Sequence, residues 1–384
     1  MKRNAPEALN AAKMTLDIVY IVLGLIALVA GGELLVRGAS RIALLWGVSP
    51  LVVGLTVVAF GTSAPEAAVS ILSSFKGASG VAVGNVMGSN IFNILAVLGL
   101  SALVAPLAVH QQVVRIEASL GVAVTLLLTG LIVDGVIGRV DGAILFFGIL
   151  AYTFWAVRQS RAESIEIQEE YTREFGAKLR RNGHMALPAL VIAAGVAILV
   201  LGSNLLVNGA SAMAKRLGVD DLVIGLTIVA AGTSLPELAT SVIAGLKQER
   251  DIAVGNVVGS NLFNILFVLG LAGMAAPAGL AVPPEALRFD VWVMLGVAGL
   301  ALPVFFSGYR ISRWEGAVFL FFYAMYLCFI VLSATGRQDL TAFKIAVLCF
   351  MIPMLVLIIG TAAWQLLFSK KIPASRRPRA QKRN

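Results

Sequence analysis

Hydrophobic residues in this chain come in long runs rather than in the amphipathic stripes of a soluble domain. A helix of roughly 20 apolar residues crosses a hydrocarbon core about 30 Å thick. Eleven candidate runs fall near residues 16–36, 50–75, 80–105, 115–133, 140–157, 186–207, 221–246, 252–276, 288–306, 315–334 and 342–368. The pattern predicts an all-α polytopic membrane protein with about eleven transmembrane helices.

Two stretches of the chain repeat each other. Residues 54–100 and 225–271 align without a gap at an offset of 171, and 29 of the 47 positions are identical. Weaker matches extend the repeat to five helices in each half, residues 16–158 and 186–334. Because five is odd, the second copy crosses the membrane in the opposite direction. Inverted repeats with broken helices and a midplane site are typical of secondary transporters.

The polar segments around these halves predict topology. Residues 159–185 are expected to form a cytoplasmic linker, 342–368 an extra helix, and 369–384 a basic cytoplasmic tail. Placing the N-terminus outside and the C-terminus inside puts 20 of the 30 Lys and Arg residues on the cytoplasmic side, as the positive-inside rule favours. The net charge of +9 lies in loops and the tail without interleaved aromatics, so we expect no nucleic-acid binding. No cleavable signal peptide is expected at the N-terminus.

Each repeat carries one glutamate, Glu66 or Glu237, near the middle of an apolar span that has no Lys or Arg. A charged residue at the bilayer centre costs at least about 2.5–3.5 kcal/mol. A protonated or paired structural glutamate is one interpretation. A bound cation that supplies the missing counter-charge is the interpretation we favour.

A proline precedes each glutamate, and a glycine lies four residues before that proline. A proline inside a helix lacks an N–H and clashes with the carbonyl four residues back. The helices are therefore predicted to break near residues 59–62 and 230–233, and the breaks free backbone carbonyls. Carbonyl, hydroxyl and carboxylate oxygens are the ligands that hard cations such as Ca²⁺ prefer. A kink that serves packing alone is the alternative.

Further polar side chains share the helical faces of these segments. Residues four apart lie on one face, as do Thr62 and Glu66, with Ser63 beside them. The following helix has a stripe of Asn85, Ser89 and Asn93. The second copy repeats both groups with Thr233, Ser234, Glu237, Asn256, Ser260 and Asn264. The hydroxyls could instead bond to their own helix, and the roles of Asn85 and Asn256 are open.

Three other groups of residues have simpler interpretations. Asn90 and Asn261 face elsewhere and are expected to make interhelical hydrogen bonds. The GxxxG glycines of the same helices are expected to serve close packing. The charged residues near the starts of later helices are expected to snorkel to the interface: Arg115, Glu117, Arg288 and Asp290.

Two copies of GTSxPE, each followed by GNxxGSNxFN, resemble the α-repeats of the calcium/cation antiporter superfamily, in particular small prokaryotic sodium/calcium exchangers. The resemblance covers about residues 16–334. It implies a ten-helix core in a bacterial inner membrane that exchanges Ca²⁺ for Na⁺ by alternating access. It implies that the cation ligands are Thr62, Ser63, Glu66, Ser89, Asn93, Thr233, Ser234, Glu237, Ser260 and Asn264, with the backbone carbonyls of Ala59 and Ala230.

One departure from the family pattern concerns Asn264, where some relatives, including potassium-dependent exchangers, carry Asp. Two carboxylates in place of three argue against potassium coupling. An H⁺-coupled antiporter and a passive cation channel remain alternatives. A membrane enzyme is disfavoured because the spans hold no nucleophile–base pair. We expect no cofactor besides the transported Ca²⁺ and Na⁺, and the sequence does not predict the oligomeric state.

Overall fold

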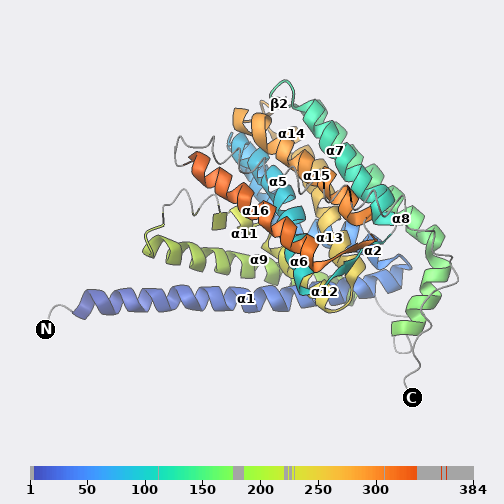
Figure 1. The fold of residues 1–384 in the computed structure, drawn as a ribbon, viewed down its shortest axis with the longest axis horizontal. Coiled ribbons are helices and arrows are strands. Elements are labelled where there is room, and N and C mark those ends of the chain that lie inside the picture. Colours follow the sequence, from blue (N-terminus) through green and yellow to red (C-terminus); the bar gives the residue numbers. More distant parts are fainter. Residues whose placement is uncertain are drawn as a thin grey trace, which may run out of the picture.

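The computed structural model describes residues 4–110, 112–175, 186–219, 230–306 and 308–334, together with residues 224, 227, 228, 356 and 360. These residues are almost entirely helical (Figure 1). The predicted eleventh helix, 342–368, and the tail, 369–384, lie outside the described residues except at positions 356 and 360.

The two halves contain corresponding elements, with π-helices written η. The first half has α1 (Asn4–Trp46), α2 (Pro50–Val53), η1 (Gly54–Val58), α3 (Ala59–Thr62), α4 (Ala64–Phe75), α5 (Ser79–Phe92), η2 (Asn93–Leu98), α6 (Gly99–Val104), β1 (Leu107–Ala108), η3 (Val113–Glu117), α7 (Ala118–Leu131), β2 (Val136–Ile137) and α8 (Arg139–Phe175). The second half has α9 (Ala186–Arg216), α11 (Ala230–Gly232), α12 (Leu235–Leu246), α13 (Arg250–Phe263), η5 (Asn264–Leu269), α14 (Gly270–Ala275), β3 (Leu280–Ala281), η6 (Ala286–Asp290), α15 (Val291–Phe306), β4 (Arg310–Ile311) and α16 (Arg313–Ala334).

The described helices agree with the predicted polytopic fold. Seven are long and apolar enough to cross a membrane, and a bent pair, Pro50–Thr62 with Ala64–Phe75, makes an eighth. Two shorter apolar helices, α7 and α12, occupy two of the three remaining predicted spans, and the third is 342–368. One boundary differs from expectation, because α8 continues to Phe175 and so extends into the segment predicted as a linker.

Helices α1 and α9 lie side by side along one edge of the molecule (Figure 1). Glycines recur every seven residues on both helices, at Gly24, Gly31 and Gly38 and at Gly195, Gly202 and Gly209. A Cβ on Gly31 would lie 2.8 Å from the backbone nitrogen of Leu199, and one on Gly195 would lie 2.8 Å from that of Leu35. The glycines therefore allow the two backbones to approach more closely than side chains would permit.

Apolar side chains cover much of the outer surface. Ile26 on α1, Phe154 on α8 and Leu190 on α9 are each more than half exposed, at 59%, 68% and 65%. Exposed apolar surface on this scale marks a surface that contacts a membrane or a partner. Together with the apolar spans, it identifies the hydrocarbon of the bilayer as the surroundings of these helices.

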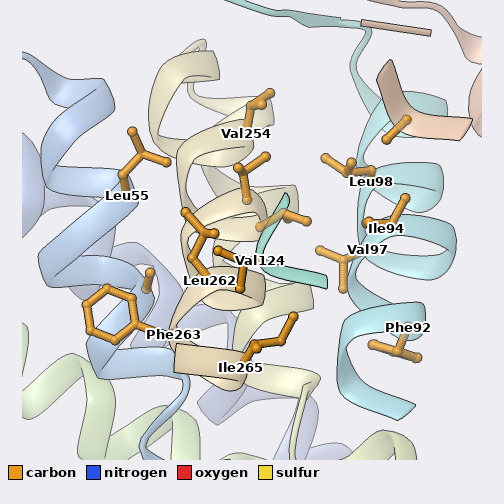
Figure 2. Packing of buried hydrophobic residues seen from close by; sticks show 14 of the residues in the cluster. Leu55, Phe92, Ile94, Val97, Leu98, Val124, Val254, Leu262, Phe263 and Ile265 are labelled. Atoms are coloured by element: carbon orange, nitrogen blue, oxygen red, sulfur yellow. The ribbon is translucent and has the colours of Figure 1, made fainter. Parts of the chain in front are cut away.

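Helix α13 runs through the centre of the bundle and packs against both η1 and η2. Figure 2 shows Leu55 of η1 on one side of α13, and Ile94 and Val97 of η2 on the other. A Cβ on Gly259 of α13 would lie 2.6 Å from the carbonyl oxygen of Leu55, so this glycine serves close packing as predicted. The residues of the second half that correspond in sequence to this contact, 221–226, lie outside the described residues except for 224.

Two short antiparallel strand pairs join the halves. Strand β1 pairs with β4, and β2 pairs with β3. Each pair links the loop after the third helix of one half to the loop after the fourth helix of the other. Both loops of a pair are predicted on the same side of the membrane, so the pairing is consistent with the alternating order of the ten spans.

We expect Gly31→Leu to destabilise the folded protein, because the new side chain would push the backbones of α1 and α9 apart. Overpacking of this kind costs about 1–3 kcal/mol. The thermal unfolding midpoint of the purified protein in detergent measures the effect. Gly130→Ala is the matched control, since a Cβ there would meet no described atom within 4 Å. Equal midpoints for the two variants would contradict the close approach.

Candidate cation-binding site

Glu66 and Glu237 occupy equivalent places in the first turns of α4 and α12. Both are fully buried, with 0% of the residue exposed. A helix N-terminus carries partial positive charge from its unpaired N–H groups, which stabilises a nearby carboxylate. The preceding proline occupies one of the first two helical positions in each case, where its missing N–H costs little.

The helix breaks fall at or next to the predicted positions. In the first copy the helical axis bends by 47° where α3 ends at Thr62 and α4 begins at Ala64. In the second copy, α11 ends at Gly232 and α12 begins at Leu235. Proline and the loosened turn thus interrupt each helix just before its glutamate, as the sequence indicated.

One backbone carbonyl released by a break has a partner of its own, and the Ala59 carbonyl keeps its helical donor. A proline at 236 leaves the Gly232 carbonyl without its helical donor, and the Ser203 hydroxyl of α9 donates to that carbonyl instead. The Ala59 carbonyl accepts the N–H of Ser63 at 3.0 Å. Ala59 is therefore not free in this arrangement, and its role as a ligand stays a prediction, as does that of Ala230, the first residue of α11.

Each carboxylate accepts a hydroxyl hydrogen bond from the opposite half. Ser234 Oγ donates to Glu66 Oε1 at 2.8 Å, and Ser63 Oγ donates to Glu237 Oε1 at 3.2 Å. Ser89 Oγ also lies 3.4 Å from Glu66 Oε1. The two repeats therefore complete each other around one shared centre, and neither glutamate is satisfied by its own half alone.

Four side-chain oxygens at this centre are buried and accept no hydrogen bond from the described residues. They are Glu66 Oε2, Glu237 Oε2, Asn93 Oδ1 and Asn264 Oδ1. Burying such oxygens without a partner is costly, and carboxylate and amide oxygens are ligands of Ca²⁺. The donor set fits a hard cation, with two carboxylates and neutral oxygens completing it.

The structure shows what Asn85 and Asn256, whose roles the sequence left open, contact. Asn85 Nδ2 donates to the Glu66 carbonyl at 3.2 Å and to Ser70 Oγ at 3.0 Å. Asn256 Nδ2 repeats these bonds to the Glu237 carbonyl at 3.3 Å and Ser241 Oγ at 2.9 Å. These asparagines hold the helix turns that carry the glutamates.

The threonines of the motif bond to these same asparagines. Thr62 Oγ1 donates to Asn256 Oδ1 at 3.0 Å, and Thr233 Oγ1 donates to Asn85 Oδ1 at 3.3 Å. Thr62 Oγ1 also lies 3.2 Å from the Val58 carbonyl and 3.3 Å from Ser260 Oγ. The contact with the Val58 carbonyl is a bond to the threonine's own helix, which is the alternative interpretation of these hydroxyls. That alternative therefore describes one of the contacts of Thr62.

Sequence reasoning missed three buried hydroxyls. Ser70 and Ser241 lie one turn after the glutamates and bond to the helix-supporting asparagines, so the same four-residue spacing could have found them. Thr240 is fully buried, and its hydroxyl has no partner among the described residues. The first copy has Val69 at that position, so the two halves of the site are not chemically equal.

The expectation that Glu117 snorkels to the interface is wrong. Glu117 is fully buried and accepts a hydrogen bond from Gln112 Nε2 at 2.8 Å. It lines a cavity of about 40 Å³ that Asn90 and Asn261 also line. Its counterpart Asp290 is only partly buried and accepts a bond from the Tyr326 hydroxyl at 3.1 Å.

These features define a class: a membrane protein built as an inverted repeat, with buried carboxylate and amide oxygens gathered between its halves, which is the architecture of a secondary transporter. The family described as sodium/calcium exchanger protein matches residues 16–158 and 187–332 of the chain. The chain belongs to this family and is a transporter rather than an enzyme.

Individual relatives cover most of the chain. The inner membrane protein YrbG of Escherichia coli (strain K12) is 38% identical over 285 residues, which are 74% of this chain and 87% of YrbG. The sodium/calcium exchanger MaX1 of Methanosarcina acetivorans is 32% identical over 345 residues, covering 82% of this chain and 98% of MaX1. A solved structure of the sodium-calcium exchanger NCX_Mj, soaked with Na⁺ and Sr²⁺, superposes with a TM-score of 0.68 at 31% identity, covering 85% of this chain and 100% of that one.

We expect Asn256→Leu to destabilise the protein by about 1–3 kcal/mol, the cost of leaving buried polar groups unpaired. The change removes the partners of the Glu237 carbonyl, Ser241 and Thr62 together. Thermal unfolding in detergent is the measurement. Ser101→Ala serves as the control, because the buried Ser101 hydroxyl has no partner among the described residues to lose. A loss no larger than that of the control would argue against the supporting role.

Proposed function

We propose that this protein is a secondary active antiporter that exchanges Ca²⁺ for Na⁺ by alternating access, with Glu66 and Glu237 at the centre of the cation site. The observation that carries the proposal is the pair of fully buried carboxylates, one from each inverted half, each with an oxygen that has no partner among the described residues. The family and the names of the relatives MaX1 and NCX_Mj support the choice of ions.

Charge explains how one site could serve both ions. Two ionised glutamates carry −2, which one Ca²⁺ or two Na⁺ would balance. Because the same oxygens would bind either cargo, occupancy by one excludes the other, and the two fluxes become coupled. Ca²⁺ and Na⁺ are the only ligands this scheme requires, so we propose no cofactor.

Potassium independence is part of the proposal. Asn264 is neutral where some relatives carry a third acid, so the proposed ligand set holds two carboxylates, Glu66 and Glu237. A site with two carboxylates has no further fixed charge to balance an additional K⁺.

A proton-coupled antiporter is the second candidate, because buried carboxylates can bind H⁺ in place of a cation. A passive channel is a weaker candidate. Both glutamates of the site are fully buried. The inverted repeat provides two symmetry-related routes to them, a design suited to alternating exposure. We place the protein in a bacterial inner membrane, as the name of the relative YrbG suggests, with the N-terminus outside and the C-terminus in the cytoplasm.

We expect Glu66→Gln or Glu237→Gln to abolish ⁴⁵Ca²⁺ uptake driven by a Na⁺ gradient in proteoliposomes. Each change removes one of the two charges that balance the cargo while keeping the shape of the side chain. Glu285→Gln is the matched control, since Glu285 is an exposed residue at the start of η6. Retained uptake in both site variants would refute the assignment of the glutamates.

Ca²⁺ flux under separate Na⁺, K⁺ and H⁺ gradients tests the coupling ion. We expect uptake with the Na⁺ gradient and none with K⁺ or H⁺ alone. Uptake driven by a pH gradient without Na⁺ would favour the proton-coupled alternative. Flux that needs no counter-ion would favour a channel.

A further inference from the structure

An asparagine can bind a cation only when its amide oxygen faces the ion, because its NH₂ group is a hydrogen-bond donor. Rotating the amide by half a turn exchanges the two groups. We propose that Asn90 and Asn261, which lie outside the ligand set, are positioning residues that hold the oxygens of Asn264 and Asn93 toward the cation. This inference rests on the proposed function and adds to it what keeps the two neutral ligands in a binding orientation.

The two pairs of amides form a two-fold arrangement between the segment where α5 continues into η2 and the segment where α13 continues into η5. Asn93 Nδ2 donates to Asn261 Oδ1 at 3.0 Å, and Asn264 Nδ2 donates to Asn90 Oδ1 at 3.0 Å. The NH₂ group of each ligand asparagine is thus fixed by a hydrogen bond, and its Oδ1 points the other way. Both ligand oxygens have no partner among the described residues, so they are available to an ion.

Backbone carbonyls set the direction of these bonds. Asn90 Nδ2 donates to the carbonyl of Asn261 at 3.2 Å, and Asn261 Nδ2 donates to the carbonyl of Asn90 at 3.4 Å. A carbonyl can only accept, so Asn90 and Asn261 must turn their NH₂ groups toward it. Their oxygens then face the ligand asparagines, which must donate. Reversing either ligand would place two amide oxygens against each other.

Each ligand also lies on the face of its helix that contacts the glutamate motifs. Ser89, one turn before Asn93, lies 3.4 Å from Glu66 Oε1. Ser260, one turn before Asn264, contacts Thr62 of the opposite half at 3.3 Å. The side chain that a positioning asparagine orients therefore belongs to the cation site rather than to the surrounding core.

The arrangement connects the halves in a specific way. Asn261 of the second half orients the ligand of the first, and Asn90 of the first half orients the ligand of the second. A purely interhelical role would require only that these amides bond to one another, whatever the chemistry of the residue at position 264 or 93. The positioning role predicts in addition that the effect of Asn90 depends on the chemistry of the residue it orients.

A carboxylate at the ligand position provides the test, because its two oxygens are equivalent and need no orientation. Ca²⁺ binding is measured by calorimetry on the purified full-length protein in detergent, for the wild type, Asn90→Ala, Asn264→Asp and the double variant. In the wild-type background we expect Asn90→Ala to weaken Ca²⁺ binding about ten-fold, because a misoriented ligand costs about as much binding free energy as one lost hydrogen bond. In the Asn264→Asp background we expect the same change to weaken binding less than about two-fold.

An equal loss in both backgrounds, or no loss in the wild-type background, would overturn the positioning role and leave the proposed function standing. A wild-type protein that binds no Ca²⁺ would overturn the proposed function and this inference with it. The mirror set, Asn261→Ala with Asn93→Asp, gives the same comparison where Asn90→Ala fails to fold, and the same outcomes decide it.

Discussion

Removing a carboxylate from water costs several kilocalories per mole even after the protein relaxes around it. Glu66 and Glu237 bear that cost together inside a bundle whose outer surface is apolar. Much of the surrounding structure can be understood as a response to it. The prolines break the helices, and the breaks place both glutamates at helix N-termini. In the proposed function, a bound cation supplies the counter-charge that the protein itself does not.

The second consequence is that neither half can form the site alone. Ser234 bonds to Glu66 and Ser63 bonds to Glu237 across the interface. The bonds from Thr62 to Asn256 and from Thr233 to Asn85 also cross between the halves. Buried polar networks stabilise a structure only when their members are satisfied. Docking the halves in one register therefore satisfies many groups at once, which ties the formation of the site to the fold.

The helical fold, the repeat and the identity of the central residues could be predicted from the sequence, because long apolar runs and a carboxylate within a membrane span are each compatible with few structures. The partners could not. The position of Glu117 near a helix start suggested the interface, yet contacts with Gln112 and neighbouring helices bury it. Likewise, the spacing that identified Asn93 could not show which residue of the other half bonds to its amide. Such contacts depend on how the two halves dock, and the local pattern of one segment carries no information about that.

The departures from symmetry matter as much as the repeat. Two identical inverted halves that exchange conformations, as the proposed mechanism requires, would give the inward- and outward-facing states equal free energies. Any preference must come from residues that differ between the copies. The ion pair between Glu33 of α1 and Lys247 of the α12–α13 loop, at 3.0 Å, is one such difference. Its counterparts at the 171-residue offset are Asn204 and Lys76, which cannot form an ion pair. This contact therefore has no equivalent in the other half, and it is one of the differences from which a preference between the two states can arise.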